Sequence, residues 1–335
     1  MDSARAAAVA DFLAAEGWGQ TQPALLAADA SFRRYYRLAE SGRRAVLMDA
    51  PPPHEDVRPY VAVAAMLRGH GLSAPEIFAE DSELGLLLIE DFGDDTYTRL
   101  LARGADESRL YALAIDTLVA LQRAVDAPPA LPAYDEEVLL REAALLTEWY
   151  APAVLGAPLP AALHEEYLAL WRAVLPQAAL PAATLVLRDY HVDNLMLLDG
   201  RAGVQGCGLL DFQDALCGPA SYDLVSLLED ARRDVAADLA TRIKQRYLGA
   251  FDDLDRAAFD ASYAILGAQR SAKIVGIFTR LCVRDGKPQY LAHIPRVWQI
   301  LQRGLKHPAL APVAAWFARH IPEAERKIPP CRPAA

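Results

Sequence analysis

Short apolar runs separated by turn residues fill the first ninety positions of this chain. Residues 35–38 and 45–48 flank a Ser-Gly pair, a pattern that predicts a β-hairpin. Residues 77–79 and 84–89 predict two further strands joined by a tight turn. Between these pairs, residues 57–70 carry a helical pattern that a glycine ends. The N-terminal part is therefore predicted to be a small antiparallel sheet with one helix beside it.

The pattern changes after residue 90. Up to about residue 180 the apolar positions follow helical spacing, and one stripe contains Leu163, Tyr167, Leu170, Trp171 and Val174. Residues 185–187 and 195–198 predict short strands that enter and leave a polar loop, and a further apolar run, 208–210, follows an Asp-Gly turn. Strands first, then helices around an embedded loop, predict an α+β fold with two lobes.

We predict three parts along the chain. Residues 1–90 form a small lobe, with a short N-terminal helix added to the sheet and its helix. Residues 91–325 form a larger helical lobe that contains the polar loop. Residues 326–335 hold three prolines and are predicted to be a frayed tail.

Composition narrows the range of partners. The chain has 335 residues, 53% of them hydrophobic, and a net charge of −10 without any basic block, which argues against nucleic acid. No apolar run approaches the roughly 20 residues of a membrane span. The four cysteines lack metal-site spacing and are predicted to be reduced thiols in a cytoplasmic protein.

The polar loop carries the most informative residues. Asp189 is followed five positions later by Asn194, and Asp211 ends the next apolar run before an aromatic residue. Protein kinases carry the same order. Phosphoryl transfer explains it, because one carboxylate lies near the acceptor hydroxyl while other oxygens hold Mg²⁺ at the phosphates. We predict Asp189 as the catalytic base, with Asn194 and Asp211 as metal ligands. The alternative is an ordinary hairpin with carboxylates that cap its turns.

Four segments resemble the aminoglycoside-phosphotransferase-type, kinase-like superfamily: ADASFRRYYRL at 28–38, LMDAPP at 47–52, RDYHVDN at 188–194 and LLDFQDA at 209–215. They are most similar to one branch, the bacterial cell-wall-recycling kinases that phosphorylate N-acetylmuramate and N-acetylglucosamine on the anomeric hydroxyl. The superfamily's catalytic loop usually has the form His-Gly-Asp-x-x-x-x-Asn. Here Leu187 and Arg188 stand in place of the His-Gly pair. The resemblance spans residues 24–283 and implies a two-lobed protein-kinase-like fold.

Nucleotide contacts are expected in the small lobe. Residues 84–93 end a strand in a glycine-containing turn and are predicted to be the hinge for adenine, with Glu90 as its marker. The phosphate loop lacks glycine, so Ser31 and Arg33, with Arg34 as the alternative to Arg33, are predicted to contact the phosphates instead. By register, Met48 stands where kinases carry a phosphate-pairing Lys. The alternative to the hinge is a strand followed by a helix cap. The alternative to the phosphate contacts is that the arginines form a solvated face.

Substrate contacts are expected in the helical lobe. Arg270, Lys273 and Arg280 lie on one side of a mostly apolar helix, and buried cations need partners. These partners are the acids of the loop or an anionic sugar; alternatively, the cations pair with core acids or extend to water. We predict Arg270 and Lys273 as substrate-binding residues. His191 either contacts substrate or braces the loop.

Asp223 belongs to a Pro-x-x-Tyr-Asp pattern in which the resemblance implies support of the loop from a helix start. The alternative is N-capping by Ser221, with Asp223 as a favourable acid in the first turn.

These residues predict a monomeric, Mg·ATP-dependent small-molecule kinase. The resemblance implies that it phosphorylates the anomeric hydroxyl of an N-acetylated amino sugar. A kinase for an aminoglycoside or another small hydroxyl compound is the alternative within enzymes. From another class, a nucleotide-binding pseudokinase is suggested by the missing Lys and glycines, while the complete set of Asp189, Asn194 and Asp211 opposes it.

Overall fold

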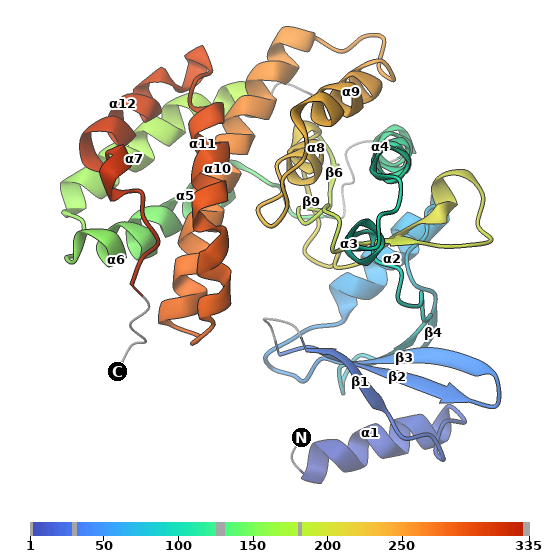
Figure 1. The fold of residues 1–335 in the computed structure, drawn as a ribbon. Coiled ribbons are helices and arrows are strands. Elements are labelled where there is room, and N and C mark those ends of the chain that lie inside the picture. The colour runs from blue at the N-terminus through green and yellow to red at the C-terminus, as the bar shows by residue number, and fades with distance from the viewer. Residues whose placement is uncertain (1–2, 29–31, 125–130, 180–182, 331–335) are drawn as a thin grey trace. The chain divides into compact units, whose positions relative to one another are not determined.

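The computed structural model describes residues 3–28, 32–124, 131–179 and 183–330 (Figure 1). The chain divides into two compact units, each made of two stretches of sequence. Unit 1 comprises residues 1–117 and 192–215, and unit 2 comprises residues 118–191 and 216–335. The chain crosses between them within α4 (Glu107–Ala124), after His191 and after Ala215. The lobe boundaries at residues 90 and 325 stay predictions.

Unit 1 is built on an antiparallel sheet that has five strands among the described residues, in the order β1-β2-β3-β5-β4. The strands are β1 (Ala24–Ala28), β2 (Arg34–Glu40), β3 (Arg43–Asp49), β4 (Ile77–Asp81) and β5 (Leu86–Ile89). Ser41 and Gly42 join β2 to β3 with φ angles of 50° and 83°. Paired positive φ angles match the right-handed twist of a hairpin, so the Ser-Gly turn forms where the sequence predicts it.

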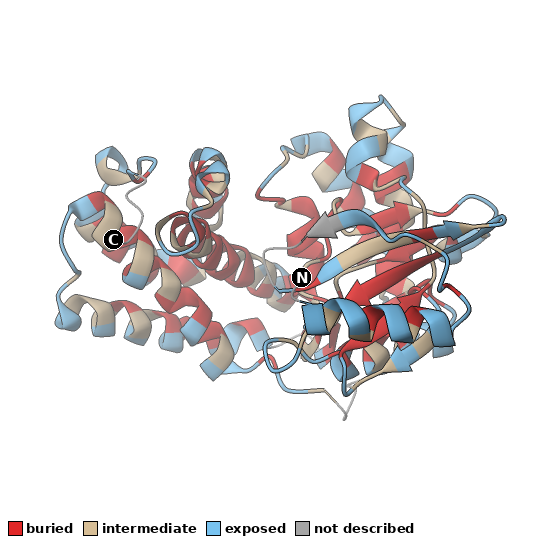
Figure 2. Cartoon of the chain, turned by 90° about the horizontal axis from the view of Figure 1, so that it is seen from below, coloured by how far each residue is buried: buried red, intermediate tan, exposed pale blue. Residues whose placement is uncertain are grey.

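Helix α1 (Ser3–Ala15) lies along the sheet in Figure 1. Its Val9 and Leu13, together with Trp18, pack against Leu38 and Leu47 of the strands, and the outer side of α1 is exposed in Figure 2. Arg5 anchors the helix through an ion pair of 2.5 Å with the Asp49 carboxylate. The remaining elements of unit 1 are α2 (Arg58–Gly69), α3 (Tyr97–Ala102), the first part of α4, and the hairpin of β7 (Leu195–Leu197) and β8 (Cys207–Leu209).

Unit 2 is helical and centred on α10 (Arg256–Val283), which is buried along most of its second half. Asp255 caps this helix by accepting hydrogen bonds from the N–H groups of Ala257 and Ala258, both at 3.0 Å. At Gly276 a Cβ atom would lie 2.3 Å from the carbonyl carbon of Leu145, so only glycine permits this helix contact.

Seven other α-helices of the described residues complete unit 2: α5 (Glu136–Leu145), α6 (Ala151–Leu155), α7 (Ala161–Val174), α8 (Ser221–Leu228), α9 (Ala237–Leu248), α11 (Ile294–Gly304) and α12 (Ala311–His320). Tyr167 and Trp171 of the predicted stripe on α7 are fully buried. A π-helical turn, Leu146–Tyr150, follows α5. The described 3₁₀ turns are Leu175–Ala179, Pro288–His293, Pro308–Leu310 and Glu323–Glu325 in unit 2, with Gly203–Gly206 in unit 1. No helix in the described part of the chain is long and apolar enough to cross a membrane.

Two features depart from the sequence pattern. The strand that enters the polar loop, β6 (Ala183–Val186), pairs with β9 (Leu216–Pro219), a strand whose Gly and Pro gave no strand signal. The prediction of four reduced cysteines is wrong for Cys282, which is disulfide-bonded, while Cys207 and Cys217 are thiols. Spacing along the chain does not report which cysteines meet in space.

Candidate nucleotide pocket and catalytic loop

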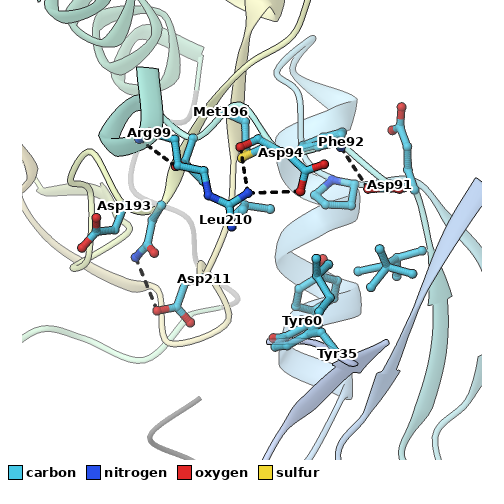
Figure 3. A pocket seen from close by; sticks show the side chains of 18 residues that line it. Tyr35, Tyr60, Asp91, Phe92, Asp94, Arg99, Asp193, Met196, Leu210 and Asp211 are labelled. Atoms are coloured by element: carbon cyan, nitrogen blue, oxygen red, sulfur yellow. Dashed lines mark hydrogen bonds and ion pairs between the residues drawn. The ribbon is translucent and has the colours of Figure 1, made fainter. Parts of the chain in front are cut away.

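Unit 1 contains a cavity of about 400 Å³ formed by the sheet, α2, the segment after β5 and the β7–β8 hairpin. Its apolar wall is formed by Leu26, Val46, Ile89, Phe92, Met196 and Leu210. Figure 3 shows Asp193 and Asp211 along one side and Asp91 and Phe92 at the opposite side. A largely apolar cavity with a few polar groups at its edges is the usual form of a small-molecule site.

The predicted hinge residue, Glu90, lines this cavity. Its N–H group donates to the Glu76 carbonyl at 2.8 Å, and its carboxylate binds the Arg201 guanidinium. Both groups are therefore committed to holding the strand end. Among the hydrogen bonds of the described residues, the N–H of Phe92 donates to no protein group. The backbone edge that remains open to a ligand is thus the stretch just after Glu90.

Arg37 on β2 fixes the shape of that stretch, a role that sequence reasoning missed. Its guanidinium forms ion pairs with Asp91 at 2.8 Å and Asp94 at 3.0 Å, and it donates to the Gly93 carbonyl at 2.9 Å. The pKa of Arg37 is raised, because these hydrogen bonds outweigh the effect of burial. Arg37 and Asp91 are 54 positions apart in the chain, so no local pattern indicates the pair.

Asn194 and Asp211 meet at the polar edge of the cavity. The Asn194 amide donates to the Asp211 carboxylate at 3.4 Å, and the Leu210 N–H donates to the Asn194 carbonyl at 3.0 Å. Asp211 has a φ of 58°, a left-handed conformation that costs a residue with a side chain free energy and often occurs at functional sites. Gln213 steadies its other carboxylate oxygen at 2.8 Å.

An amide oxygen and a carboxylate are suitable ligands for Mg²⁺. The described residues contain no cluster of three or more His, Cys, Asp or Glu side chains that suits a metal ion. A kinase-type Mg²⁺ site does not need such a cluster, because phosphate oxygens and water supply the remaining ligands. The residues present therefore fit this metal.

The structure places one of the two predicted phosphate-loop residues. Arg33 is buried and lies 3.8 Å from the carboxylates of both Asp211 and Glu55. Burial opposes the charge of Arg33, but Tyr35 and these acids raise its pKa. Met48 is buried on β3 between Tyr35 and Leu87 of the neighbouring strands. Ser31 lies outside the described residues.

The loop before Asp189 belongs to unit 2 and bends sharply. Arg188 has a φ of 70°. Asp223, on the first turn of α8 and fully buried, accepts hydrogen bonds from the N–H groups of Leu187 at 2.7 Å and Arg188 at 2.9 Å. Burial raises the pKa of Asp223 to about 7, against the effect of these two donors. The carboxylate of Asp223 thus lies directly against the loop backbone.

Positive charges surround the Asp189 carboxylate. Arg270 lies 3.9 Å from it and donates to the Ser226 hydroxyl at 2.8 Å. Burial alone would raise the pKa of Asp189, but the charges of Lys273 and Arg270 lower it. Lys273 itself donates to Glu142 at 2.7 Å, so it pairs with an acid of the core. Asp189 is therefore held in its ionised form.

His191 is buried next to this loop. Burial lowers its pKa, so the imidazole is neutral at pH 7. Its Nε2 atom lies 3.3 Å from an Arg232 nitrogen, which is a donor only, so the ring proton belongs on Nδ1. That buried Nδ1 has no hydrogen-bond partner among the described residues.

The chain is similar to known proteins over most of its length. The model of a phosphotransferase enzyme family matches residues 24–259. A relative from Caulobacter vibrioides, named N-acetylmuramate/N-acetylglucosamine kinase, is 38% identical over 98% of this chain and 99% of its own length. A relative of the same name from Pseudomonas aeruginosa is 42% identical over 92% of each chain.

Solved structures show the fold. An ADP-bound aminoglycoside phosphotransferase is similar with a TM-score of 0.59 at 14% identity, over 90% of this chain and 97% of that one. A choline kinase from Streptococcus pneumoniae is similar with a TM-score of 0.59 at 11% identity, over 92% of this chain and 99% of that one. The predicted protein-kinase-like α+β fold is confirmed. The match over more than half of the chain and the identity to these relatives establish that the chain belongs to the phosphotransferase enzyme family.

Proposed function

We propose that this chain is an ATP-dependent kinase that phosphorylates the anomeric hydroxyl of N-acetylmuramate and N-acetylglucosamine during peptidoglycan recycling. One observation carries the substrate assignment. Four relatives, 37–42% identical over 89–98% of this chain, bear the name N-acetylmuramate/N-acetylglucosamine kinase. The cavity of unit 1 supports the nucleotide half of the proposal.

In this proposal, adenine lies between the apolar side chains of the cavity and pairs with the backbone after Glu90. Val46 lies on the sheet side, and Met196 and Leu210 come from the β7–β8 hairpin and its end. The polar edge with Asn194 and Asp211 then receives the phosphates. Arg33, close to Asp211, supplies positive charge on a planar fork that suits phosphate oxygens.

Asn194 and Asp211 would hold Mg²⁺, which neutralises charge on the phosphates when bound. Asp189 would accept the proton of the sugar hydroxyl, and its ionised state fits a base. Asp223 would keep the loop in place. Arg270 and His191 would contact the sugar, with the His191 Nδ1–H as a donor. Ser31 stays a proposed phosphate contact.

Two features of the cellular setting belong to the same proposal. The enzyme would act in the cytoplasm as a monomer, and its net charge of −10 supports a small-molecule substrate over nucleic acid.

The disulfide of Cys282 bears on the cytoplasmic location, because structural disulfides are uncommon in reducing compartments. Counting thiols in protein prepared with and without reductant tests whether the Cys282 disulfide is present in the active enzyme.

A substrate panel tests the activity. Purified protein with Mg·ATP is offered N-acetylmuramate, N-acetylglucosamine, glucosamine, glucose and an aminoglycoside, and ADP release is followed. Phosphorus NMR of the product then distinguishes an anomeric phosphate from other esters by its coupling to the sugar protons. Turnover of the two N-acetylated sugars to a C1 phosphate is expected. Turnover of the aminoglycoside alone would overturn the substrate assignment, and Mg·ATP binding without turnover of any sugar would favour a pseudokinase.

A further inference from the structure

Arg188 occupies a backbone conformation that normally belongs to glycine. Its φ of 70° lies in the left-handed region, which is unfavourable for a residue with a Cβ atom. Interactions of Arg188, through its backbone N–H and its side chain, offset a strain that glycine would avoid.

A buried acid on α5 meets this side chain. Glu142 is only 7% exposed, and one of its oxygens accepts from the Arg188 guanidinium at 2.5 Å and from the Lys273 ammonium at 2.7 Å. Its other oxygen accepts from the Tyr134 hydroxyl at 2.5 Å and from the Gln269 amide at 3.4 Å. Burial opposes ionisation, yet Lys273 and Arg188 lower the pKa of Glu142. The carboxylate is charged and fixed from four directions.

The loop is thus held at two levels immediately before Asp189. Asp223 holds the backbone N–H of Arg188, and Glu142 holds its guanidinium. The guanidinium also lies over the Tyr134 ring, 5.6 Å from its centre. A charge-assisted hydrogen bond to a buried, fully engaged acid restricts the side chain more than a surface ion pair does.

We propose that Glu142 and Arg188 form a positioning pair in which the anchored arginine fixes the direction of Asp189. The proposal rests on the proposed kinase function. It also gives Lys273 a role other than substrate contact, because its ammonium balances the charge of Glu142.

Two substitutions at one position separate the side-chain anchor from backbone strain. Arg188→Gly removes the anchor and relieves the strain, whereas Arg188→Ala removes the anchor and keeps the strain. If the anchor positions Asp189, both variants lose kcat at least tenfold, on the scale of the about 10²-fold that a misplacement of 1 Å costs. The KM for ATP stays within about twofold, because the nucleotide pocket is untouched. Glu142→Gln gives a similar loss, and adding it to Arg188→Gly brings little further loss, since paired residues are not additive.

Ser262→Ala is the matched control. Ser262 lies on the same helix as Lys273 and is fully buried, with hydrogen bonds to Ser221 and Ala178, so its loss lowers stability without touching the pair. Its kcat per folded molecule is expected to equal that of the wild type. Amide exchange of residues 183–191, measured by mass spectrometry, is a second readout that does not depend on activity. It should rise in Arg188→Gly and Glu142→Gln, but not in Ser262→Ala.

The outcomes separate this inference from the proposed function. A wild-type kcat together with unchanged loop exchange in Arg188→Gly overturns the positioning pair, whatever the substrate is. Loss in Arg188→Ala with full activity in Arg188→Gly shows that only backbone strain matters, and it also overturns the pair. An inactive wild type refutes the kinase proposal, while faster loop exchange in the variants still supports the pair.

Discussion

Replacement of Asp223 by Asn exchanges one carboxylate oxygen for an amide group, and it tests whether Asp223 supports the loop before Asp189. The two Asp223 oxygens accept separate hydrogen bonds from the N–H groups of Leu187 and Arg188. An Asn side chain offers one oxygen, and its amide group would face the second N–H as a donor against a donor. A buried N–H that loses its acceptor costs about 1–3 kcal/mol. Asp223→Asn should therefore weaken the loop by about this amount and lower kcat with it.

Amide exchange measures this cost directly. A loss of about 1–3 kcal/mol corresponds to about a 5- to 150-fold faster exchange of the affected amides. Peptides covering residues 183–191 are followed in the wild type, in Asp223→Asn and in Asp255→Asn. The last variant is a matched control, because Asp255 also accepts from two backbone N–H groups but at an exposed helix start, where Asn caps nearly as well as Asp. Unchanged loop exchange in Asp223→Asn would refute the support role.

The pH dependence of this variant has a definite sign. The pKa of Asp223 in the folded protein is about 7, above its usual value, because of burial. At pH values between the ordinary pKa of an aspartate and about 7, the folded state binds more protons than the unfolded state. Asp223 therefore favours folding at low pH, and it loses that contribution as the pH rises through about 7. The stability gap between wild type and Asp223→Asn should narrow from pH 5 to pH 8, as urea unfolding would show. A gap that widens would contradict the raised pKa.

Three further predictions concern the chemistry. Asp189→Asn should lower kcat by at least about 10²-fold, the lower range for general-base help, while calorimetry shows little change in Mg·ATP affinity. Asp211→Asn should abolish turnover at saturating Mg²⁺ with an unchanged circular dichroism spectrum, and near-normal activity would exclude it as a ligand. Arg33→Ala should raise the KM for ATP and Met48→Ala should not, since only the first removes a charge near Asp211; equal effects would place the phosphate contact elsewhere.

Local patterns predicted the parts of this fold that local interactions decide. The β2–β3 hairpin follows from alternating residues and a Ser-Gly turn, and α2 stops two residues before Gly71, whose φ is 75°. The structure also brings Asn194 and Asp211 together, because the β7–β8 hairpin between them is a short, local element, while their role as metal ligands stays a prediction. In each case the residues that decide the structure are near neighbours in the chain.

Long-range partners were not predictable from the sequence. Arg37 is 54 positions from Asp91, and Glu142 is 46 positions from Arg188 and 131 from Lys273. The spacing on α10 correctly indicated that Arg270 and Lys273 are buried, whereas Arg280 is only half-buried. It did not identify which acid meets which cation, because the answer depends on how α5 and α10 pack. Sequence reasoning also missed the pairing of β6 with β9 and the disulfide of Cys282, because both depend on how the chain folds and not on spacing along it.

The charges around Asp189 bear on how the proposed reaction would proceed. Arg270 and Lys273 lower its pKa, which keeps the carboxylate ionised but also makes it a weaker base. A strong base would be needed if proton removal led the reaction. In loose phosphoryl transfer, however, the alignment of the hydroxyl and the stabilisation of charge contribute most of the rate. Under the proposed function, Asp189 would therefore orient the sugar hydroxyl and take its proton late. That role would explain why the loop before it is held by two buried acids, Asp223 and Glu142, and why loosening either should cost activity even with Asp189 intact.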